Sequence, residues 1–275
     1  MKQKQGVALV VAGVDAGSTA IKVTLYDGRR LLNRMAPAGW NPKEAAAALL
    51  QKTAVEWEME PTALDGIVGT GYGRNGLSFV TRSVTEITCH GRGSAYLQQG
   101  CRTVIDIGGQ DAKAIRIDEQ GRVVDFVMND KCAAGTGRFL QTMAQALDLD
   151  VAELSEVALA ATEACTINAM CTVFAESEVI GLLNRGCSRP AIVAGLHRSV
   201  ANRVGAMAAR VSPIGPVTLT GGVAVNDHLR QELARNLGLP VHSPAAAVFA
   251  GSTGAALIAW DMATAESGKR TMPGG

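Results

Sequence analysis

One short pattern occurs twice in this chain, and it constrains the fold more than any other feature. The pattern Asp-x-Gly-x-x-x-x-Lys runs from Asp15 to Lys22 and again from Asp106 to Lys113. Each copy follows a short apolar run, at residues 10–14 and 103–105, and precedes an alternating run of branched residues, at 21–26 and 114–118. Such runs on both sides of a glycine turn predict strand, turn and strand. We therefore expect two copies of one hairpin-based unit.

A glycine turn between two strands suits the binding of an anion, because it lets backbone N–H groups approach closely. The Asp of each copy can hold a metal ion or order a water, and the Lys can offset phosphate charge. A lone Asp-x-Gly turn is most often just a hairpin, but its duplication favours the phosphate interpretation. Two such hairpins facing one another would clamp a nucleotide. The chain has no Gly-x-x-x-x-Gly-Lys-Ser/Thr pattern, and its Gly135-Thr-Gly137 lacks the third glycine of a dinucleotide-binding turn.

Length and composition exclude several classes of protein. The 275 residues are enough for two modest domains, which the repeat favours. Lys and Arg total 26 against 25 Asp and Glu, and the basic residues are scattered, so no nucleic-acid footprint is expected. Aromatic residues make up 4%, too few for stacking on single strands. Hydrophobic residues occur in short periodic segments, so no transmembrane helix is expected.

The start of the chain and its cysteines indicate a cytoplasmic protein. Residues 1–13 superficially resemble a signal peptide, but the strand, turn and strand around Asp15 favour a buried first strand. The 6 cysteines have no close-spaced framework, so reduced thiols or metal ligands are expected rather than disulfides.

Strand and helix patterns alternate throughout, which predicts an α/β fold. Helices are expected over residues 42–58, 86–96, 134–147, 175–184, 190–212, 226–237 and 255–260. The first domain is expected to cover residues 1–95, completed by a C-terminal helix over 252–265. The second domain is expected to cover 96–251, and residues 266–275 are expected to form a disordered tail.

Two cysteines stand immediately before predicted amphipathic helices, namely Cys132 and Cys171. The positive end of a helix dipole stabilises negative charge, such as that of a thiolate or a thiolate-bound iron–sulfur cluster. A [4Fe–4S] cluster takes four thiolates, so two chains related by a two-fold axis would supply them. This placement predicts a homodimer with one cluster at its axis. The other cysteines are expected to be structural, because free Cys is often buried: Cys89, Cys101, Cys165 and Cys187. His197, His228 and His242 show no metal-ligand spacing.

Six segments together resemble one family: residues 13–19, 70–74, 106–113, 128–140, 171–178 and 220–223. That family is the ATP-dependent activators of 2-hydroxyacyl-CoA dehydratases, which are relatives of the ATPase subunits of benzoyl-CoA reductase. The resemblance runs from about residue 9 to residue 260. The two cysteine motifs are far more specific than the glycine turns, which actin, sugar kinases and heat-shock ATPases share.

The resemblance implies homodimers of the actin-like ATPase fold, with two duplicated domains in each chain. One [4Fe–4S] cluster would be shared between subunits, an assignment that carries onto Cys132 and Cys171. Ferredoxin or flavodoxin would supply a low-potential electron. ATP binding and hydrolysis would then drive its transfer to a separate iron–sulfur dehydratase, in anaerobic metabolism.

The resemblance also implies roles for individual residues in binding ATP or ADP. Phosphates and Mg²⁺ would be held by Asp15, Ala16, Gly17, Ser18, Thr19 and Lys22. The opposing phosphate turn would consist of Asp106, Gly108, Gly109, Gln110 and Asp111. Gln110 would order the attacking water, and Asp15 and Asp106 are the other candidate catalytic residues. The adenosine side would be lined by Gly221, Gly222 and Gly251.

Three other functions remain compatible with the sequence. A small-molecule kinase of the same superfamily would use an Asp as base on a hydroxyl, but it would leave the two cysteines idle, so iron content discriminates. An activator of a different reductase, of the benzoyl-CoA type or with a double-cubane cluster, differs only in its partner. A non-enzymatic actin-like scaffold would bind nucleotide without partner-dependent turnover.

Overall fold

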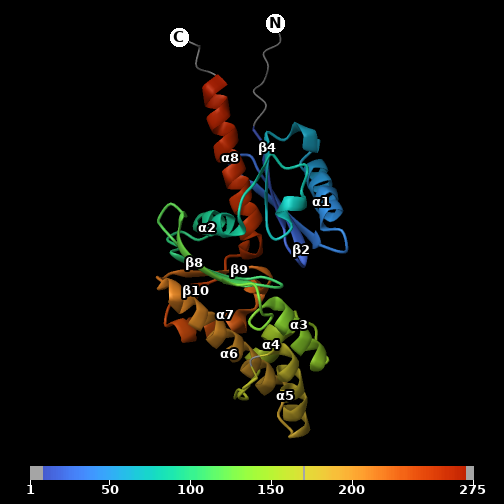
Figure 1. The fold of residues 1–275 in the computed structure, drawn as a ribbon, viewed down its shortest axis with the longest axis vertical. Helices are drawn as coiled ribbons and strands as arrows, with labels where there is room; N and C mark the ends of the chain where they lie inside the picture. The colour runs from blue at the N-terminus through green and yellow to red at the C-terminus, as the bar shows by residue number, and fades with distance from the viewer. Residues whose placement is uncertain (1–8, 170, 271–275) are drawn as a thin grey trace. The chain divides into compact units, whose positions relative to one another are not determined.

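The computed structural model describes residues 9–169 and 171–270, except for the side chains of 267–270. The chain divides into two compact units, one formed by residues 1–96 and 249–275 and the other by residues 97–248 (Figure 1). The domain boundaries expected from the sequence follow residues 95 and 251, whereas those in the structure follow residues 96 and 248. Helix α8 (Ala250–Arg270) extends through residues 266–270, where the sequence predicted a disordered tail. The rest of that predicted tail, residues 271–275, lies outside the described residues.

The first unit is built on a five-stranded sheet of order β3-β2-β1-β4-β5. Strands β1, β2 and β3 are antiparallel neighbours, whereas β4 is parallel to β1 and β5 is parallel to β4. The strands are β1 (Val11–Ala16), β2 (Ala20–Tyr26), β3 (Leu31–Pro37), β4 (Gly66–Thr70) and β5 (Arg82–Ser83). The accompanying helices are α1 (Pro42–Glu56), α2 (Glu86–Leu97) and α8.

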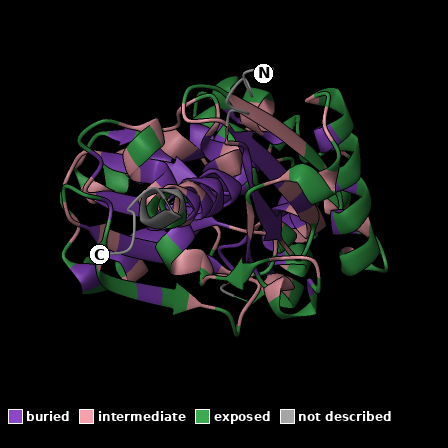
Figure 2. Cartoon of the chain, turned by 90° about the horizontal axis from the view of Figure 1, so that it is seen from above, coloured by how far each residue is buried: buried purple, intermediate pink, exposed green. Residues whose placement is uncertain are grey.

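Close packing of α8 on β1 explains why the C-terminal segment belongs to the first unit. All residues of β1 are buried. A Cβ added at Gly13 would lie 2.0 Å from the carbonyl oxygen of Ser252, so glycine is what lets the two backbones meet. In Figure 2 many residues of the inner strands are drawn as buried. This packing fixes the strand that carries Asp15.

The second unit repeats this architecture with a sheet of order β10-β9-β6-β7-β8. Strands β6, β7 and β8 are antiparallel neighbours, and β9 is parallel to both β6 and β10. The strands are β6 (Thr103–Ile107), β7 (Ala112–Ile117), β8 (Val123–Asn129), β9 (Val217–Thr220) and β10 (Val241–His242). The helices are α3 (Gly137–Ala146), α4 (Leu154–Leu159), α5 (Thr172–Asn184), α6 (Arg189–Ala208) and α7 (Asp227–Leu237). The duplicated α/β fold is thus confirmed, and α4 is a helix that the sequence patterns missed.

A buried pair of histidines joins α6 to α7. The Nδ1 atoms of His197 and His228 are 3.0 Å apart, and Asn226 Nδ2 lies 3.0 Å from His197 Nε2. Asn226 Oδ1 accepts the backbone N–H of Leu229, so its amide group donates to His197, whose Nδ1 then carries the proton given to His228. Burial, aided by the charge of His228, lowers the pKa of His197 to about 3. The pair is therefore neutral near pH 7 and holds α6 in place.

Two expectations from composition concern disulfides and membranes. All six cysteines lie in the described residues and are free thiols. Cys89 and Cys101 are buried, Cys171 is exposed, and the other three are half-buried. In the part of the chain that the structure describes, no helix combines the length and the hydropathy needed to cross a membrane.

Candidate functional site

The first repeated motif forms a hairpin, and its spacing places the Asp and the Lys opposite each other. Asp15 at the end of β1 pairs directly with Lys22 on β2. Lys22 Nζ lies 3.3 Å from Asp15 Oδ2, and the two side chains are 13% and 7% exposed. The turn between them contains Gly17, Ser18 and Thr19, of which Ser18 and Thr19 are exposed. The hairpin thus holds a nearly buried carboxylate beside an accessible glycine turn.

The second motif forms the same hairpin with a more deeply buried ion cluster. Asp106 on β6 pairs directly with Lys113 on β7. Lys113 Nζ lies 3.2 Å from Asp106 Oδ2 and 2.8 Å from Asp111 Oδ1, and its side chain is 2% exposed. A charge so buried is tolerated only where it is compensated, so the charge of Lys113 serves these carboxylates. Gln110, in contrast, is exposed in the turn.

The structure adds a third repeated element that the local sequence patterns did not predict, a Thr-Gly pair at the ends of β4 and β9. Thr70 on β4 lies opposite Asp15, and Thr220 on β9 lies opposite Asp106. Thr220 Oγ1 donates a hydrogen bond of 2.9 Å to Asp106 Oδ1. The glycines that follow have φ angles of +89° at Gly71 and +86° at Gly221, and an added Cβ would lie within 3 Å of the motif carboxylate in both cases. The full repeat is therefore Asp, Lys and Thr-Gly.

The three glycines assigned by resemblance to the adenosine side lie in different surroundings. Gly221 abuts Asp106 in the second unit, whereas Gly251 lies in the first unit at the start of α8. A Cβ at Gly251 would be 3.1 Å from Asp15 Oδ2 and 2.9 Å from His90 Nε2. Gly222 faces open space. Glycine at positions 221 and 251 thus leaves room for the two motif carboxylates, a structural role that the sequence did not indicate.

The turn of the second hairpin is hydrogen-bonded to the start of α3. Gly137 N donates to Gly108 O, and Arg138 N donates to Gly109 O, both at 2.8 Å. A Cβ at Gly137 would lie 3.1 Å from that Gly108 oxygen, so the contact favours glycine. The first N–H groups of a helix have no partner within the helix, and here the hairpin turn supplies one. The turn is thus in direct contact with the start of α3, the helix that follows Cys132.

The structure corrects the predicted position of Cys132. Helix α3 begins at Gly137 with Thr136 as its N-cap, so Cys132 lies in the loop ahead of the helix rather than at its start. The cause is local, because Gly135 has a φ of +86° and the backbone N–H of Thr136 turns back to Ala133 O at 3.0 Å. Asn129 holds this loop by donating to Cys132 O at 2.8 Å. Cys171, in contrast, is the N-cap of α5, as expected, and is exposed.

Both cysteines of the cysteine motifs, Cys132 and Cys171, are at least partly accessible. Among residues 9–169 and 171–270 no three His, Cys, Asp or Glu side chains gather in a way that could hold a metal ion. The exposed Cys171 and the half-buried Cys132 offer two thiolates, and thiolates are the usual ligands of iron–sulfur clusters. Within the residues that the structure describes, one chain thus presents no complete ligand set for a [4Fe–4S] cluster.

Comparison with known protein families gives one match that covers most of the chain. Residues 12–259 match the BadF/BadG/BcrA/BcrD ATPase family. The chain belongs to this family. As a member of the BadF/BadG/BcrA/BcrD ATPase family, it is an ATPase. The two hairpins are the parts of this ATPase with the features of phosphate-binding turns.

Three relatives of this ATPase have informative descriptions. The (R)-2-hydroxyglutaryl-CoA dehydratase activating ATPase of Acidaminococcus fermentans is 40% identical, over 93% of this chain and 99% of that protein. The 2-hydroxyisocaproyl-CoA dehydratase activator of Clostridioides difficile is 39% identical, over 91% of this chain and 95% of that protein. A solved structure of a 2-hydroxyisocaproyl-CoA dehydratase activator with bound ADPNP matches with a TM-score of 0.91 and 37% identity, covering 97% of this chain and 100% of that one. These matches confirm the predicted actin-like fold.

Proposed function

We propose that this ATPase activates an iron–sulfur dehydratase of 2-hydroxyacyl-CoA thioesters by delivering one low-potential electron to it. The observation that carries the proposal is the direct hydrogen bonding between the turn of the second hairpin and the helix that follows Cys132. It joins a nucleotide motif to a cysteine motif, a pairing that a kinase would not need. The identity of 40% and 39% to two dehydratase activators supports a dehydratase as partner.

ATP is bound through both hairpins in this proposal, together with Mg²⁺. Phosphates and Mg²⁺ are held by Asp15, Ala16, Gly17, Ser18, Thr19 and Lys22 on the first hairpin, and the opposing phosphate turn consists of Asp106, Gly108, Gly109, Gln110 and Asp111. Their accessible turns support this role, and the buried carboxylates behind them are held in fixed positions. Mg²⁺ keeps several waters and takes phosphate oxygens, so it needs only one or two carboxylates from the protein. Gln110, exposed in the second turn, orders the attacking water. Gly221, Gly222 and Gly251 take the adenosine side through their backbones, Gly221 and Gly251 from beside the two motif carboxylates.

Cys132 and Cys171 of two copies of the chain bind one [4Fe–4S] cluster in this proposal, which makes the active form a homodimer. A cluster held by these cysteines would supply one-electron transfer, with ferredoxin or flavodoxin as the donor. The exposure of Cys171 supports sharing between two copies, because a thiol that both copies must reach has to lie at the surface. The free state of all six thiols is consistent with a reducing cytoplasm.

ATP hydrolysis acts on the cysteine loop through the start of α3. The Gly108–Asp111 turn contacts the phosphates in this proposal, so its position differs between the ATP and ADP states. Gly108 and Gly109 accept the first two N–H groups of α3, and a shift of the turn therefore moves the start of the helix. Cys132 lies in the loop that leads into that helix and moves with it.

Substitution of Gly137 by alanine is expected to weaken this coupling. The added methyl group would press on Gly108 O at 3.1 Å and on Gly109 Cα at 3.4 Å, so the turn and the helix must separate by a few tenths of an ångström. Electrons delivered per ATP hydrolysed should fall roughly 2- to 30-fold. The matched control is Gly76→Ala, where the added Cβ meets nothing within 4 Å. Equal yields in both variants would contradict the coupling route.

The proposed activity can be tested by reconstitution without oxygen. The purified chain, reduced ferredoxin and a 2-hydroxyglutaryl-CoA or 2-hydroxyisocaproyl-CoA dehydratase are combined, and dehydration is followed with ATP or with ADPNP. Dehydration that requires both this chain and hydrolysable ATP is the expected result. A chain that fails with every dehydratase but supports a benzoyl-CoA-type or double-cubane reductase is an activator with a different partner. Formation of a phosphorylated small molecule would instead identify a kinase.

A further inference from the structure

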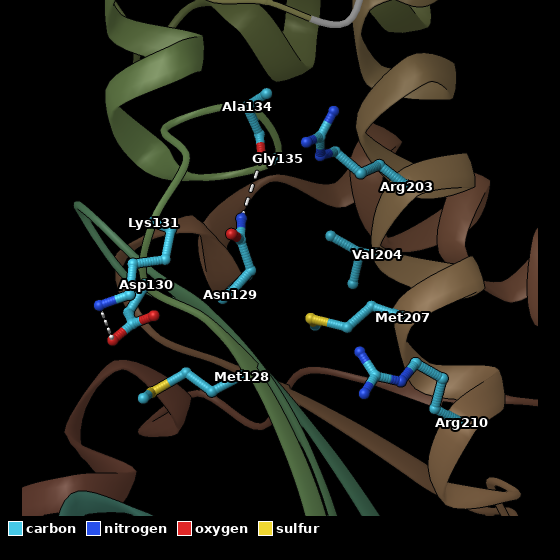
Figure 3. Close-up of a pocket in the computed structure, with 11 residues that line it drawn as sticks. Met128, Asn129, Asp130, Lys131, Ala134, Gly135, Arg203, Val204, Met207 and Arg210 are labelled. Carbon is cyan, nitrogen blue, oxygen red and sulfur yellow. Dashed lines mark hydrogen bonds and ion pairs between the residues drawn. The ribbon is translucent and has the colours of Figure 1, made fainter.

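Two cavities of the second unit share a wall formed by Ala134, Gly135 and Arg203. Their volumes are about 260 Å³ and about 340 Å³. Figure 3 shows the smaller cavity, in which Arg203 and Arg210 extend from the α6 side toward the segment that follows β8. That segment contains Lys131 and leads directly into Cys132. Arg203 therefore stands between α6 and the cysteine loop.

Arg203 contacts the sulfur of Cys132. Its Nη2 atom donates a hydrogen bond to Cys132 Sγ at 3.6 Å, across 71 positions of sequence. The loop passes close to the arginine stem, since a Cβ at Gly135 would lie 3.2 Å from Arg203 Cδ. Glycine at position 135, with its φ of +86°, thus lets the cysteine loop lie against Arg203.

The position of Arg203 on α6 is well fixed. The neighbouring residues Val200 and Val204 are buried in the core of the second unit, and His197 is held by its buried hydrogen bonds. The cavity also contains Lys131 and Asp130, whose charged groups are 3.7 Å apart, and Arg210. Of the described residues that line the cavity, Arg203 is a cation that donates a hydrogen bond to a cysteine sulfur.

We propose that Arg203 is a positioning residue that raises the reduction potential of the cluster by donating to the thiolate of Cys132. This inference rests on the proposed function, which makes Cys132 a cluster ligand. Reduction adds negative charge to the cluster and its sulfurs, so a nearby cation with an N–H donor stabilises the reduced form more than the oxidised form. Arg203 thereby makes the low-potential electron easier to accept. It also orients the Cys132 side chain in its loop.

The test is a redox titration of the iron-loaded dimer in the absence of oxygen. Electron paramagnetic resonance measures the reduced cluster at each potential. In Arg203→Gln the ratio of reduced to oxidised cluster at a fixed potential should fall about tenfold, which is a midpoint 59 mV lower for one electron. Arg203→Lys keeps the charge but loses the planar fork, so a smaller decrease is expected. Arg210→Gln is the matched control, because it removes the same charge from the same cavity, and it should change the ratio less than twofold.

The outcomes separate this inference from the proposed function. A wild-type dimer that takes up no iron overturns both. A wild-type dimer with four irons whose midpoint is unchanged in Arg203→Gln overturns only the role of Arg203, as does an equal decrease in Arg210→Gln, which would indicate general charge. If Arg203→Gln does not fold or load iron, the comparison of Arg203→Lys with Arg210→Lys decides, and equal midpoints count against the proposal.

Discussion

Lys113→Met is expected to lower the free energy of unfolding of the second unit by about 3–5 kcal/mol. Lys113 is 2% exposed and lies between two carboxylates, those of Asp106 and Asp111. Without the lysine charge, the carboxylates of Asp106 and Asp111 lie close together, and that of Asp106 is buried. This destabilises the fold far more than the loss of an exposed ion pair does. Met keeps the volume and the flexibility of the lysine stem, so the effect reports charge rather than a cavity.

Thermal unfolding of the nucleotide-free protein measures this effect. The midpoint of the second unit should fall by about 6–20 °C, using the usual relation between free energy and midpoint for domains of this size. Lys22→Met is the matched control in the first hairpin, where the lysine side chain is 13% exposed and lies 3.3 Å from Asp15. Its effect should be less than half as large. Similar losses in the two variants would mean that burial does not distinguish the two ion pairs.

Asp106→Asn is expected to reduce ATP hydrolysis by about 10²–10³-fold, the usual loss for one fixed electrostatic group in an active site. The carboxylate of Asp106 is held by Thr220 at 2.9 Å and by Lys113 at 3.2 Å, so its position is fixed before nucleotide binds. Asn preserves the size and one acceptor oxygen but removes the charge that would order Mg²⁺ or water. Because the hairpins repeat, Asp15→Asn should have an effect of the same order.

Steady-state phosphate release and nucleotide binding are measured together for these variants. The control is Asp118→Asn, at the other end of β7, where the carboxylate accepts the backbone N–H groups of Gln120 and Arg122. This variant should keep hydrolysis within about twofold, because Asp118 is half-buried and its hydrogen bonds stay within its own turn. If both Asp106→Asn and Asp15→Asn keep their rate of ATP hydrolysis, the motif carboxylates have no part in catalysis and serve only as ion-pair partners of Lys113 and Lys22.

Local sequence patterns predicted the hairpins because their chemistry is local. In an antiparallel hairpin the spacing from Asp15 to Lys22 fixes which residues face each other, so the motif contains its own register. The parallel partners are different, since Thr70 and Thr220 reach Asp15 and Asp106 only through long crossover connections. The Thr-Gly pairs after the two strands were the available signal, and recognition of them required alignment of the two halves.

The error at Cys132 has a physical cause of the same kind. Apolar periodicity locates the buried face of α3 but not its first residue, which is set by the left-handed conformation at Gly135 and the turn at Thr136. The contact of Arg203 with Cys132 joins two segments 71 positions apart, and no spacing rule predicts it. The pair of His197 and His228 escaped notice because only the packing of α6 on α7 brings them together.

Iron and acid-labile sulfide per dimer, measured on protein purified without oxygen, test the central claim most directly. Cys132→Ser and Cys171→Ser are measured beside the wild type. Cys187→Ser is the control, because Cys187 is also a half-buried thiol but is not assigned to the cluster. About four irons per dimer are expected in the wild type and the control, and iron should be lost in both other variants. An iron-free dimer that still hydrolyses ATP after anaerobic reconstitution would contradict it and favour a kinase.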